Sequence, residues 1–363
     1  FFTTKGHPDI LVIREGGRIE PFNFKVAYPE PYIPRSLTFE VPERINSNGE
    51  VITPLEEGVF LELLDQARDV GLEAISVCFL WSIANPVHEI RVGELITEHL
   101  PDVPFSLSHK LNPALREYRR ASATSIDASL KPLMTDYLNN LTHRLKSEGF
   151  SGETLVLTSQ GGMIEAEEMA SAPIHAINSG PSMAPIAGRY YAQLECDEDS
   201  LIIADTGGTT YDVSLVRKNR IPKTRETWIG QSFRGHMTGF PSIDIKSVGA
   251  GGGSIAKVDE GGILHVGPSS AGAVPGPVCY DMGGTEATLT DACLVLGYID
   301  PSYFLGGEMS LNTNLAREVI KEQIARPLGL EINSAAASIV SVATENMVQA
   351  ISEITVNQGI DPA

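Results

Sequence analysis

Positive charge is scarce in this sequence. Its 363 residues include 27 lysines and arginines against 46 aspartates and glutamates, which gives a formal net charge of −19 at pH 7. Such a chain is repelled by the phosphates of nucleic acids and by anionic membrane surfaces. The densest basic cluster, Arg116, Arg119 and Arg120, is too short to propose a nucleic-acid site. We therefore expect neither nucleic acid nor a membrane among its partners.

Long hydrophobic runs, paired cysteines and metal-binding spacings are also absent. The apolar run at 77–81 has five residues, whereas a helix that spans a bilayer needs about 20. The four cysteines form no C-x-x-C pair, and Cys78 and Cys293 lie in apolar or helical patterns that predict buried free thiols. The eight histidines show no H-x-H or H-E-x-x-H spacing, and no signal-peptide pattern is found. These absences predict a reduced, soluble protein of the cytoplasm.

The chain instead alternates between helix and strand patterns. Apolar residues recur every three or four positions over 59–70, and Gly71 follows as a helix stop. A strand pattern at 74–81, a helix pattern at 86–100 and a second strand pattern at 104–108 come next. Helices that alternate with apolar strands predict a parallel or mixed sheet covered by helices, which is the α/β class.

Other segments carry shorter signals of the same two kinds. Strands are predicted at 10–13, 22–28, 37–41, 154–159 and 175–180. Helices are predicted at 124–148, from Pro181 onward, and at 288–296, 313–328 and 334–355. Irregular structure is expected at 218–247 and 265–277. Pro132 should kink or divide the helix in which it falls.

Two strand patterns, at 201–205 and 211–217, are joined by a polar turn. The turn consists of Gly207, Gly208, Thr209 and Thr210. Glycine lets the backbone approach a phosphate closely, and the turn amides and threonine hydroxyls can donate hydrogen bonds to it. We assign catalytic roles to Asp205 and Asp212, which flank the turn, with Asp205 holding Mg²⁺ through water. A plain hairpin with a polar turn is the alternative.

Two further segments could approach an anion. Ser179 and Gly180 precede a predicted helix, whose N-terminus presents free amides and partial positive charge. A routine N-cap at Ser179 is the alternative. The loop at 249–254 is so dense in glycine that ATP phosphates, a substrate carbonyl or a neighbouring strand should pass close to its backbone. Its phosphate-binding candidates are Gly251, Gly252 and Gly253.

Charged residues supply further candidates for substrate binding. His109 follows a predicted strand, where open α/β sheets place ligands, and could polarise a substrate or move a proton. A structural hydrogen bond to a backbone carbonyl is the alternative. Asp244 and Lys246 could act as acid, base or oxyanion donor, although charged loop residues are most often solvated. The arginine cluster at 116–120 could anchor a carboxylate or phosphate, and its ordinary role is a salt-bridged surface.

The hairpin resembles the second phosphate loop of the actin, hexokinase and heat-shock chaperone superfamily, whose ATPases carry a D-x-G-G-x-x-x-D pattern. Longer motifs resemble the hydantoinase A/oxoprolinase family, which also includes ATP-dependent ketone carboxylase subunits. The resemblance covers nearly the whole chain. Its motifs are SLSHKLNPALREYRRASATSIDASLKP (106–132), TSQGGM (158–163), PIHAINSGPSMAPIAG (173–188), VGAGGGSIAKVDEGGILHVGPSSAGAVPGPVCYDMGGTEATLTDACLVLG (248–297) and IDPSYFLGGEMSL (299–311).

The resemblance implies an actin-like ATPase fold, with two lobes of mixed sheet and helices that face a nucleotide cleft. Residues 1–199 would form the first lobe. Residues 200–363 would form the second lobe, with the phosphate hairpin and the glycine-rich loops. The cofactors that it implies are ATP and Mg²⁺.

The resemblance also implies an activity. It is that of an ATP-dependent amidohydrolase component, which phosphorylates the carbonyl oxygen of a cyclic amide (hydantoin, 5-oxoproline or another lactam) so that water can open the ring. An ATP-dependent ketone carboxylase subunit, of the acetone or acetophenone type, is the alternative, and no residue distinguishes an amide from a ketone substrate. An actin-like nucleotide switch or chaperone is a second alternative. The motifs at 248–254 and 266–277 argue against it, because they match the enzyme family.

The sequence departs from the family pattern at both ends. The family opens with a D-x-G-G-T-x-T-D phosphate hairpin, and nothing like it precedes Phe1. A glycine-rich, adenine-side segment usually follows the step at 359–362, where this sequence stops. We therefore expect a piece of a longer polypeptide that binds ATP weakly by itself. A hydantoinase B-like subunit or fused domain is the implied partner, together with the small-molecule substrate.

Overall fold

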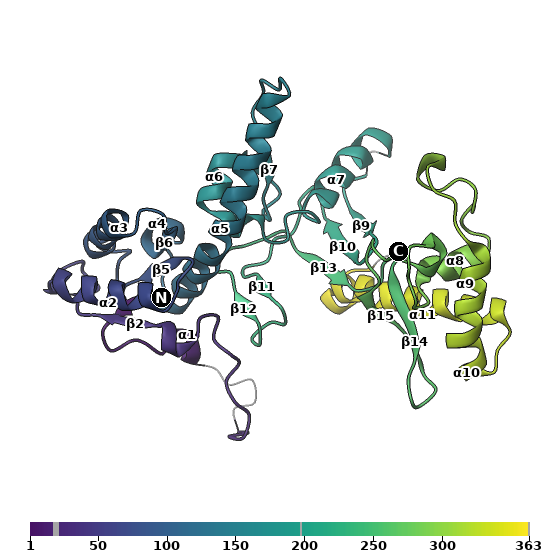
Figure 1. Ribbon diagram of the computed structural model, residues 1–363, viewed down its shortest axis with the longest axis horizontal. Helices are drawn as coiled ribbons and strands as arrows, with labels where there is room; N and C mark the ends of the chain where they lie inside the picture. Colours follow the sequence, from purple (N-terminus) through teal and green to yellow (C-terminus); the bar gives the residue numbers. More distant parts are fainter. Residues whose placement is uncertain (17–21, 197, 362–363) are drawn as a thin grey trace. The chain divides into compact units, whose positions relative to one another are not determined.

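The computed structural model describes residues 1–16, 22–196 and 198–361 (Figure 1). By its internal contacts the chain divides into two compact units. The first is Phe1–Ser182 with Lys223–Ile243, and the second is Met183–Pro222 with Asp244–Ala363. Both units combine helices with strands, which confirms the predicted α/β class.

The compact units do not separate at residue 199/200, where the sequence analysis divided the lobes. They separate between Ser182 and Met183, because helix α7 (Met183–Glu195) packs against strands β9 (Leu201–Thr206) and β10 (Tyr211–Val216). The assignment of 1–199 and 200–363 to the two lobes of an ATPase fold stays a prediction.

The first unit is built on a parallel four-stranded sheet. Its order is β2-β1-β5-β6, with β2 at Phe39–Val41, β1 at Phe2–Thr4, β5 at Ile75–Cys78 and β6 at Phe105–Leu107. Helices α2 (Glu57–Asp69) and α3 (Val87–His99) contribute buried apolar side chains to the same core. The alternation predicted over 59–108 is thereby confirmed, since every residue of β5 is buried, as a continuous apolar run requires.

Helix α5 (Glu117–Ser147) begins at Glu117 rather than at the predicted residue 124. Its first turns lie in the core, where Ala121, Ala123 and Ile126 are fully buried. These small and apolar side chains follow no simple amphipathic pattern, because packing surrounds this part of the helix. The helix continues past Pro132 and is not divided there.

The rest of the first unit consists of short elements. They are α1 (Ile10–Ile13), η1 (Arg35–Leu37), β3 (Arg44–Ile45), β4 (Val51–Thr53), α4 (Ser108–Leu111), β7 (Leu155–Leu157), β8 (Met163–Glu165), α6 (Ala166–Ser171), η2 (Pro173–Ala176), β11 (Trp228–Ile229) and β12 (His236–Met237). The strands predicted at 37–41 and 154–159 appear as β2 and β7. The segment 218–247, predicted to be irregular, contains β11 and β12 and enters β13 (Ile245–Val248).

Three predicted strands of the first unit are wrong. The segment 10–13 is helical because Leu11 packs into an apolar cluster with the first turns of α5 instead of entering a sheet. The segment 22–28 is irregular. The segment 175–180 is a 3₁₀ turn followed by further turns, held in place where the Ile174 amide donates to Asp127 Oδ1 (3.1 Å).

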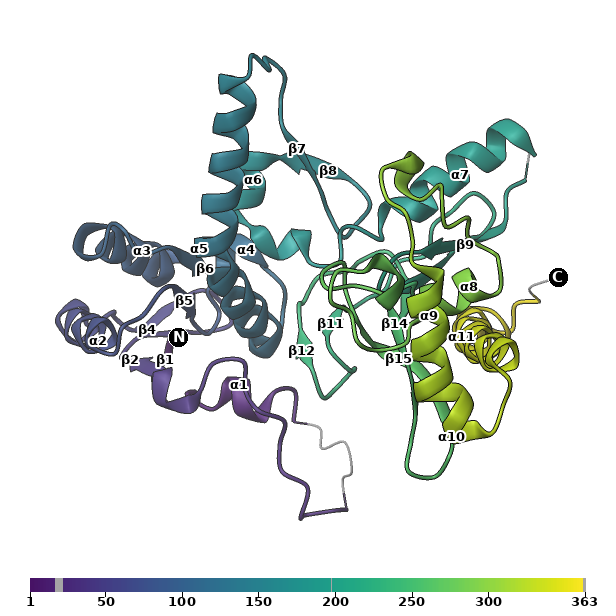
Figure 2. The same cartoon turned by 45° about the vertical axis from the view of Figure 1, so that its right-hand side comes forward.

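The second unit contains an antiparallel sheet in the order β13-β10-β9. Strands β14 (Ser254–Val258) and β15 (Leu264–Ser270) form a hairpin. Helix α11 (Ile332–Ile354) packs against β10, β13 and β15 (Figure 1), and Figure 2 shows it beside α9 (Thr313–Ile320), which it also contacts. The other elements are η3 (Val278–Tyr280), α8 (Leu289–Val295), η4 (Leu305–Gly307), α9 (Thr313–Ile320), the π-helical turn η5 (Lys321–Ala325), α10 (Arg326–Leu328) and η6 (Val356–Gln358).

The helices predicted at 288–296 and 334–355 are confirmed by α8 and α11. The helix predicted at 313–328 is confirmed in extent, with its middle in the π-helical form. The irregular segment predicted at 265–277 is wrong in its first half, because β15 extends to Ser270 and pairs Val266 with Ala256 in the core.

None of the described helices is long and apolar enough to cross a bilayer. The four cysteines are free: Cys78 and Cys279 are buried, Cys293 is half-buried and Cys196 is exposed. Burial raises the pKa of the Cys78 thiol to about 12, so this cysteine is an inert packing residue.

Candidate functional site

The turn between β9 and β10 leaves backbone donors unused. The two strands pair along their whole length, and the Gly207 amide donates to the Thr210 carbonyl (2.9 Å). The amides of Gly208, Thr209 and Thr210 donate to no acceptor in the part of the chain that the structure describes. Because the tip of this turn is exposed, its N–H groups remain available to donate to the oxygens of an anion, as the amides of phosphate-binding loops do.

The two predicted catalytic carboxylates differ in their surroundings. Asp205 and Asp212 lie opposite each other in the β9–β10 ladder, and therefore on one face of the hairpin. Asp212 is 8% exposed and accepts hydrogen bonds from Thr210 Oγ1 (3.0 Å) and from the Ser247 hydroxyl. Asp205 is exposed and has no hydrogen-bond or ion-pair partner among the described residues. Asp212 is thus satisfied within the protein, whereas Asp205 is open to a ligand.

The glycine-rich loop supports the turn from within the protein. The amides of Gly252 and Gly253 donate to the carbonyls of Gly207 (3.1 Å) and Gly208 (2.6 Å). A Cβ at Gly251 would lie 2.6 Å from the Thr209 nitrogen, so only glycine fits there. The backbone that passes close to this loop is therefore the hairpin turn. A phosphate-binding role for the loop amides stays a prediction.

Two residues of this arrangement were missed from the sequence. The Thr290 amide (2.9 Å) and hydroxyl (2.8 Å) both donate to the Gly252 carbonyl, which ties the loop to helix α8. The helix predicted from Thr288 was the one sequence feature that could have drawn attention to Thr290. Ser247 lies opposite Asp212 in the β13–β10 ladder, and no local pattern indicates that pairing.

Ser179 and Gly180 do not begin a helix. They lie in turns that follow η2, and α7 begins at Met183. The Ser182 hydroxyl closes the turn by donating to the carbonyls of Ser179 (2.6 Å) and Thr158 (2.9 Å). The helix predicted from Pro181 is present as α7 and begins two residues later, so the N-cap at Ser179 is wrong. The anion-binding role of Ser179 and Gly180 stays a prediction.

Asp244 and Lys246 lie beside the sheet of the second unit. Lys246 is in β13, opposite Val213, and its ammonium group forms an ion pair with Glu353 of α11. The Asp244 amide donates to the Pro222 carbonyl (3.0 Å) at the start of β13. The ion pair gives Lys246 a structural partner, and the substrate-binding role of both residues stays a prediction.

His109 belongs to the first unit, in helix α4 directly after strand β6. Its Nδ1 lies 2.7 Å from Oε2 of the fully buried Glu89, and its amide donates to the same oxygen (2.9 Å). The partner of the ring is therefore a carboxylate, and not the backbone carbonyl that the structural alternative names.

The arginine cluster is engaged within the first unit. Arg119 forms ion pairs with Glu15 (2.8 Å) and Glu226. Arg120 is fully buried and donates to the Phe79 carbonyl (2.9 Å). These contacts agree with a salt-bridged surface for Arg119 and give Arg120 a place in the core.

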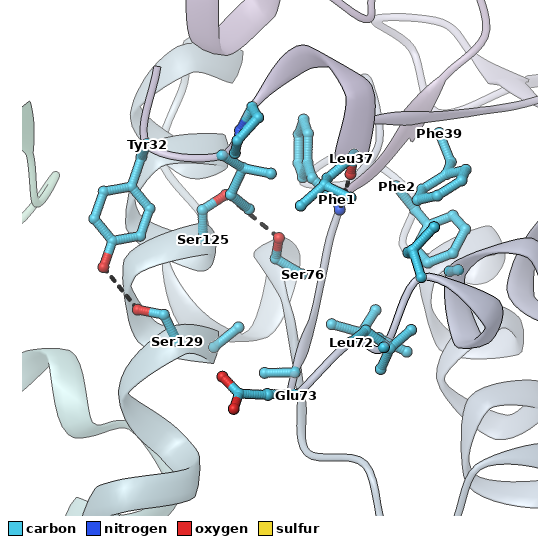
Figure 3. A pocket seen from close by; sticks show the side chains of 18 of the residues that line it. Phe1, Phe2, Tyr32, Leu37, Phe39, Leu72, Glu73, Ser76, Ser125 and Ser129 are labelled. Atoms are coloured by element: carbon cyan, nitrogen blue, oxygen red, sulfur yellow. Dashed lines mark hydrogen bonds between the residues drawn. The ribbon is translucent and has the colours of Figure 1, made fainter. Parts of the chain in front are cut away.

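A pocket of about 370 Å³ lies in the first unit, between strands β1 and β5 and helix α5 (Figure 3). Its hydroxyls bond one another, Tyr32 with Ser129 (2.7 Å) and Ser76 with Ser125 (3.3 Å). None of the site residues predicted from the sequence lines it. Within the described residues, no group of three or more His, Cys, Asp or Glu side chains could hold a metal ion.

Comparison with protein families matches two family models. The hydantoinase/oxoprolinase model matches residues 120–363, and the model of the hydantoinase/oxoprolinase N-terminal region matches residues 1–100.

Individual relatives match nearly the whole chain. The caprolactamase subunit alpha of Pseudomonas jessenii is 37% identical over 99% of this chain and 51% of its own length. The acetophenone carboxylase gamma subunit of Aromatoleum aromaticum is 38% identical over 99% of this chain and 50% of its own length. The chain spans about half the length of the curated relatives it matches.

A solved nucleotide-free structure of acetone carboxylase is similar to this chain. The match covers 100% of this chain and 52% of the acetone carboxylase chain. The TM-score is 0.85 at 27% sequence identity. This similarity agrees with the actin-like ATPase fold expected from the sequence motifs.

Proposed function

The chain belongs to the hydantoinase/oxoprolinase family, and from this premise we propose that it is the ATP-using component of an enzyme that opens cyclic amides. It would phosphorylate the carbonyl oxygen of a hydantoin, 5-oxoproline or another lactam, and water would then open the activated ring. The observation that carries the proposal is the β9–β10 turn, whose three unpaired amides lie beside Asp205. Similarity to a caprolactamase subunit supports the choice of a lactam.

The turn is suited to the phosphates of ATP. Its three free amides would donate to phosphate oxygens, and the exposed Thr209 hydroxyl adds a further donor. The amides of Gly252 and Gly253 hold the turn in shape. Donors that are fixed before the ligand arrives need no reorganisation when charge develops on it.

Mg²⁺ fits the carboxylate of Asp205. Mg²⁺ prefers oxygen ligands and keeps most of its water molecules, so one exposed carboxylate without a protein partner is an adequate anchor. We assign Asp212 a positioning role, because it accepts from Thr210 in the turn and from Ser247 in β13. When bound, Mg²⁺ would neutralise negative charge on the phosphates.

We propose that a hydantoinase B-like subunit or fused domain completes ring opening, in the cytoplasm. The described residues around the turn offer hydrogen-bond donors but no set of metal ligands for hydrolysis. An activated intermediate would decay in water, so it should pass directly to a bound partner. The caprolactamase and acetophenone carboxylase relatives are themselves named as subunits.

A ketone carboxylase is the second candidate. The acetophenone carboxylase relative and the structural similarity to acetone carboxylase favour it specifically. The two candidates differ in what stimulates ADP release by the complete polypeptide with its partner. Stimulation by a hydantoin or lactam alone supports the amidohydrolase, whereas a requirement for bicarbonate with a ketone supports the carboxylase.

Asp205→Asn tests the site itself. In the complete polypeptide with its partner, we expect ATP turnover to fall by about 100-fold or more, because the substitution removes the carboxylate that would anchor Mg²⁺ beside the phosphates. Asp199→Asn, which changes another exposed aspartate of the same unit, is the matched control and should keep wild-type turnover. Wild-type turnover in Asp205→Asn would show that the hairpin is structural only.

A further inference from the structure

A second cavity, of about 840 Å³, lies in the first unit at the free edge of strand β6. Residues of α3, β6, α4 and α5 and the segment 171–175 line it. Its apolar residues include Ile90, Phe105 and Leu111, and its more numerous polar residues include His109, Lys110 and Lys131. A cavity that combines apolar walls with directional polar groups suits a small molecule.

His109 presents a hydrogen-bond acceptor in this cavity. Its Nδ1 lies 2.7 Å from the Glu89 carboxylate, which only accepts hydrogen bonds when ionised, so the ring hydrogen of the neutral imidazole sits on Nδ1. Nε2 then keeps its lone pair, and no described residue bonds it. The His109 side chain is 17% exposed, so Nε2 remains accessible.

Glu89 holds that ring in place. Its carboxylate is fully buried and also accepts from the Phe79 amide (2.8 Å), from Ser108 Oγ (2.6 Å) and from the His109 amide (2.9 Å). A histidine whose second nitrogen is oriented by a buried carboxylate is the arrangement of a positioned acceptor or base.

Lys131 presents a donor in the same cavity. Its Nζ donates to the Phe105 carbonyl (2.7 Å) and lies 3.6 Å from Asp127 Oδ2. Asp127 is fully buried and accepts from Ser106 Oγ (2.6 Å). An ammonium group carries three hydrogens, so one hydrogen of Lys131 remains for a ligand.

The charges of the cavity are paired only in part. Lys131 is paired with Asp127, and Glu94 and Glu98 lie 2.8 Å and 3.9 Å from Arg91, which also pairs with Glu57. Lys110 lines the cavity and forms no ion pair among the described residues. Acidic and basic side chains both line the cavity, so the hydrogen-bonding groups of His109 and Lys131, and not one sign of charge, define the ligand.

We propose that this cavity binds a small molecule that carries both an N–H or O–H donor and a carbonyl. The donor bonds Nε2 of His109, and the carbonyl accepts from Nζ of Lys131. Glu89 is a positioning residue that keeps Nε2 free of hydrogen. The inference rests on the first unit alone and does not depend on nucleotide binding by the β9–β10 turn.

Two cyclic amides that differ only in a methyl group on the ring nitrogen test the proposal. The complete chain, without nucleotide, is titrated by calorimetry with 2-piperidinone and with N-methyl-2-piperidinone, which lacks the donor. We expect 2-piperidinone to bind about tenfold more tightly, the effect of one hydrogen bond. His109→Phe should abolish this difference. His99→Phe, at the exposed end of α3 and outside the cavity lining, should keep it.

A measurement on the unmodified chain tests the same contact without relying on the folding of a variant. The ¹⁵N resonance of His109 Nε2 should shift when 2-piperidinone is added and stay in place with the N-methyl derivative. Selective binding that moves this resonance supports the proposal. Equal binding of the two amides, binding of neither, or an unmoved His109 resonance overturns it, whatever ATP does at the hairpin.

Discussion

The two compact units differ in whether the polar groups compared below have hydrogen-bond partners within the protein. In the first unit, Glu89 is fully buried, and protein groups donate four hydrogen bonds to it. In the second unit, the β9–β10 turn exposes three free amides beside Asp205, which has no partner among the described residues. A buried polar group has to be satisfied by the protein, because water cannot reach it. An exposed group left unsatisfied keeps its capacity for a ligand, so we assign the first network a structural role and the turn the proposed ligand-binding role.

Of the three changes considered, removal of the Glu89 carboxylate should lower the free energy of unfolding by the largest amount. We expect Glu89→Ala to lower the free energy of unfolding of the first unit by about 3–5 kcal/mol, because its donors lose a buried, charged partner. Both tryptophans, Trp81 and Trp228, lie in the first unit, so fluorescence during urea unfolding measures its stability. Glu94→Ala, in the same helix but exposed and paired only at the surface, should change it by less than about 1 kcal/mol. Equal stability of the two variants would contradict the structural role of Glu89.

A side chain at Gly251 should perturb the second unit by a smaller amount. Its Cβ would meet the Thr209 nitrogen at 2.6 Å, so we expect Gly251→Ala to destabilise this unit by about 1–3 kcal/mol, as overpacking does. Circular dichroism should report the earlier unfolding, while tryptophan fluorescence keeps its wild-type transition. Gly208→Ala is the control, since no atom lies within 4 Å of a Cβ there. Identical unfolding of both variants would show that the loop does not support the turn.

Acidic pH should lower the free energy of unfolding of the first unit. We expect this effect to be smaller than those of Glu89→Ala and Gly251→Ala. Burial lowers the pKa of His175, and the charge of Asp127 opposes this only in part. The unfolded chain, with an ordinary histidine pKa of about 6.5, therefore binds more protons, so stability falls as the pH drops below that value.

The contribution of His175 can be isolated by substitution. His175→Gln should reduce the loss of first-unit stability between about pH 7.5 and about pH 5.5, by at most about 1.4 kcal/mol for each pH unit of its shift. His143→Gln, at an exposed histidine of α5, should leave the loss unchanged. Fluorescence-monitored unfolding at both pH values measures it, and parallel pH profiles for wild type and His175→Gln would contradict the assignment.

Strong local patterns in the sequence predicted the corresponding elements well. The alternation over 59–108 predicted α2, β5, α3 and β6, because continuous apolar strands and a 3.6-residue helical stripe are local signals. Short apolar runs were ambiguous. The segment 10–13 is a helix because its Leu11 meets helix α5, and a four-residue run carries no periodicity to show this.

The sequence predicted the hairpin but not its surroundings. The turn at 207–210 joins two paired strands that carry Asp205 and Asp212, as expected, and the phosphate chemistry that its glycines, threonines and carboxylates indicate stays a prediction. The different surroundings of the two carboxylates could not be predicted. They depend on Ser247, which reaches Asp212 only because β13 pairs with β10.

The sequence by itself determined the α/β class and the glycine-threonine turn with its flanking carboxylates, because each follows from residues close together in the chain. Only the tertiary structure decided what those residues contact. Pairing across 35 residues brings Ser247 to Asp212, and the loop beyond it brings Gly252 and Gly253 to the turn. Burial, likewise, made Glu89 the carboxylate that orients His109. Hydrogen-bond satisfaction and desolvation depend on which distant segments pack together, and no local pattern encodes that choice.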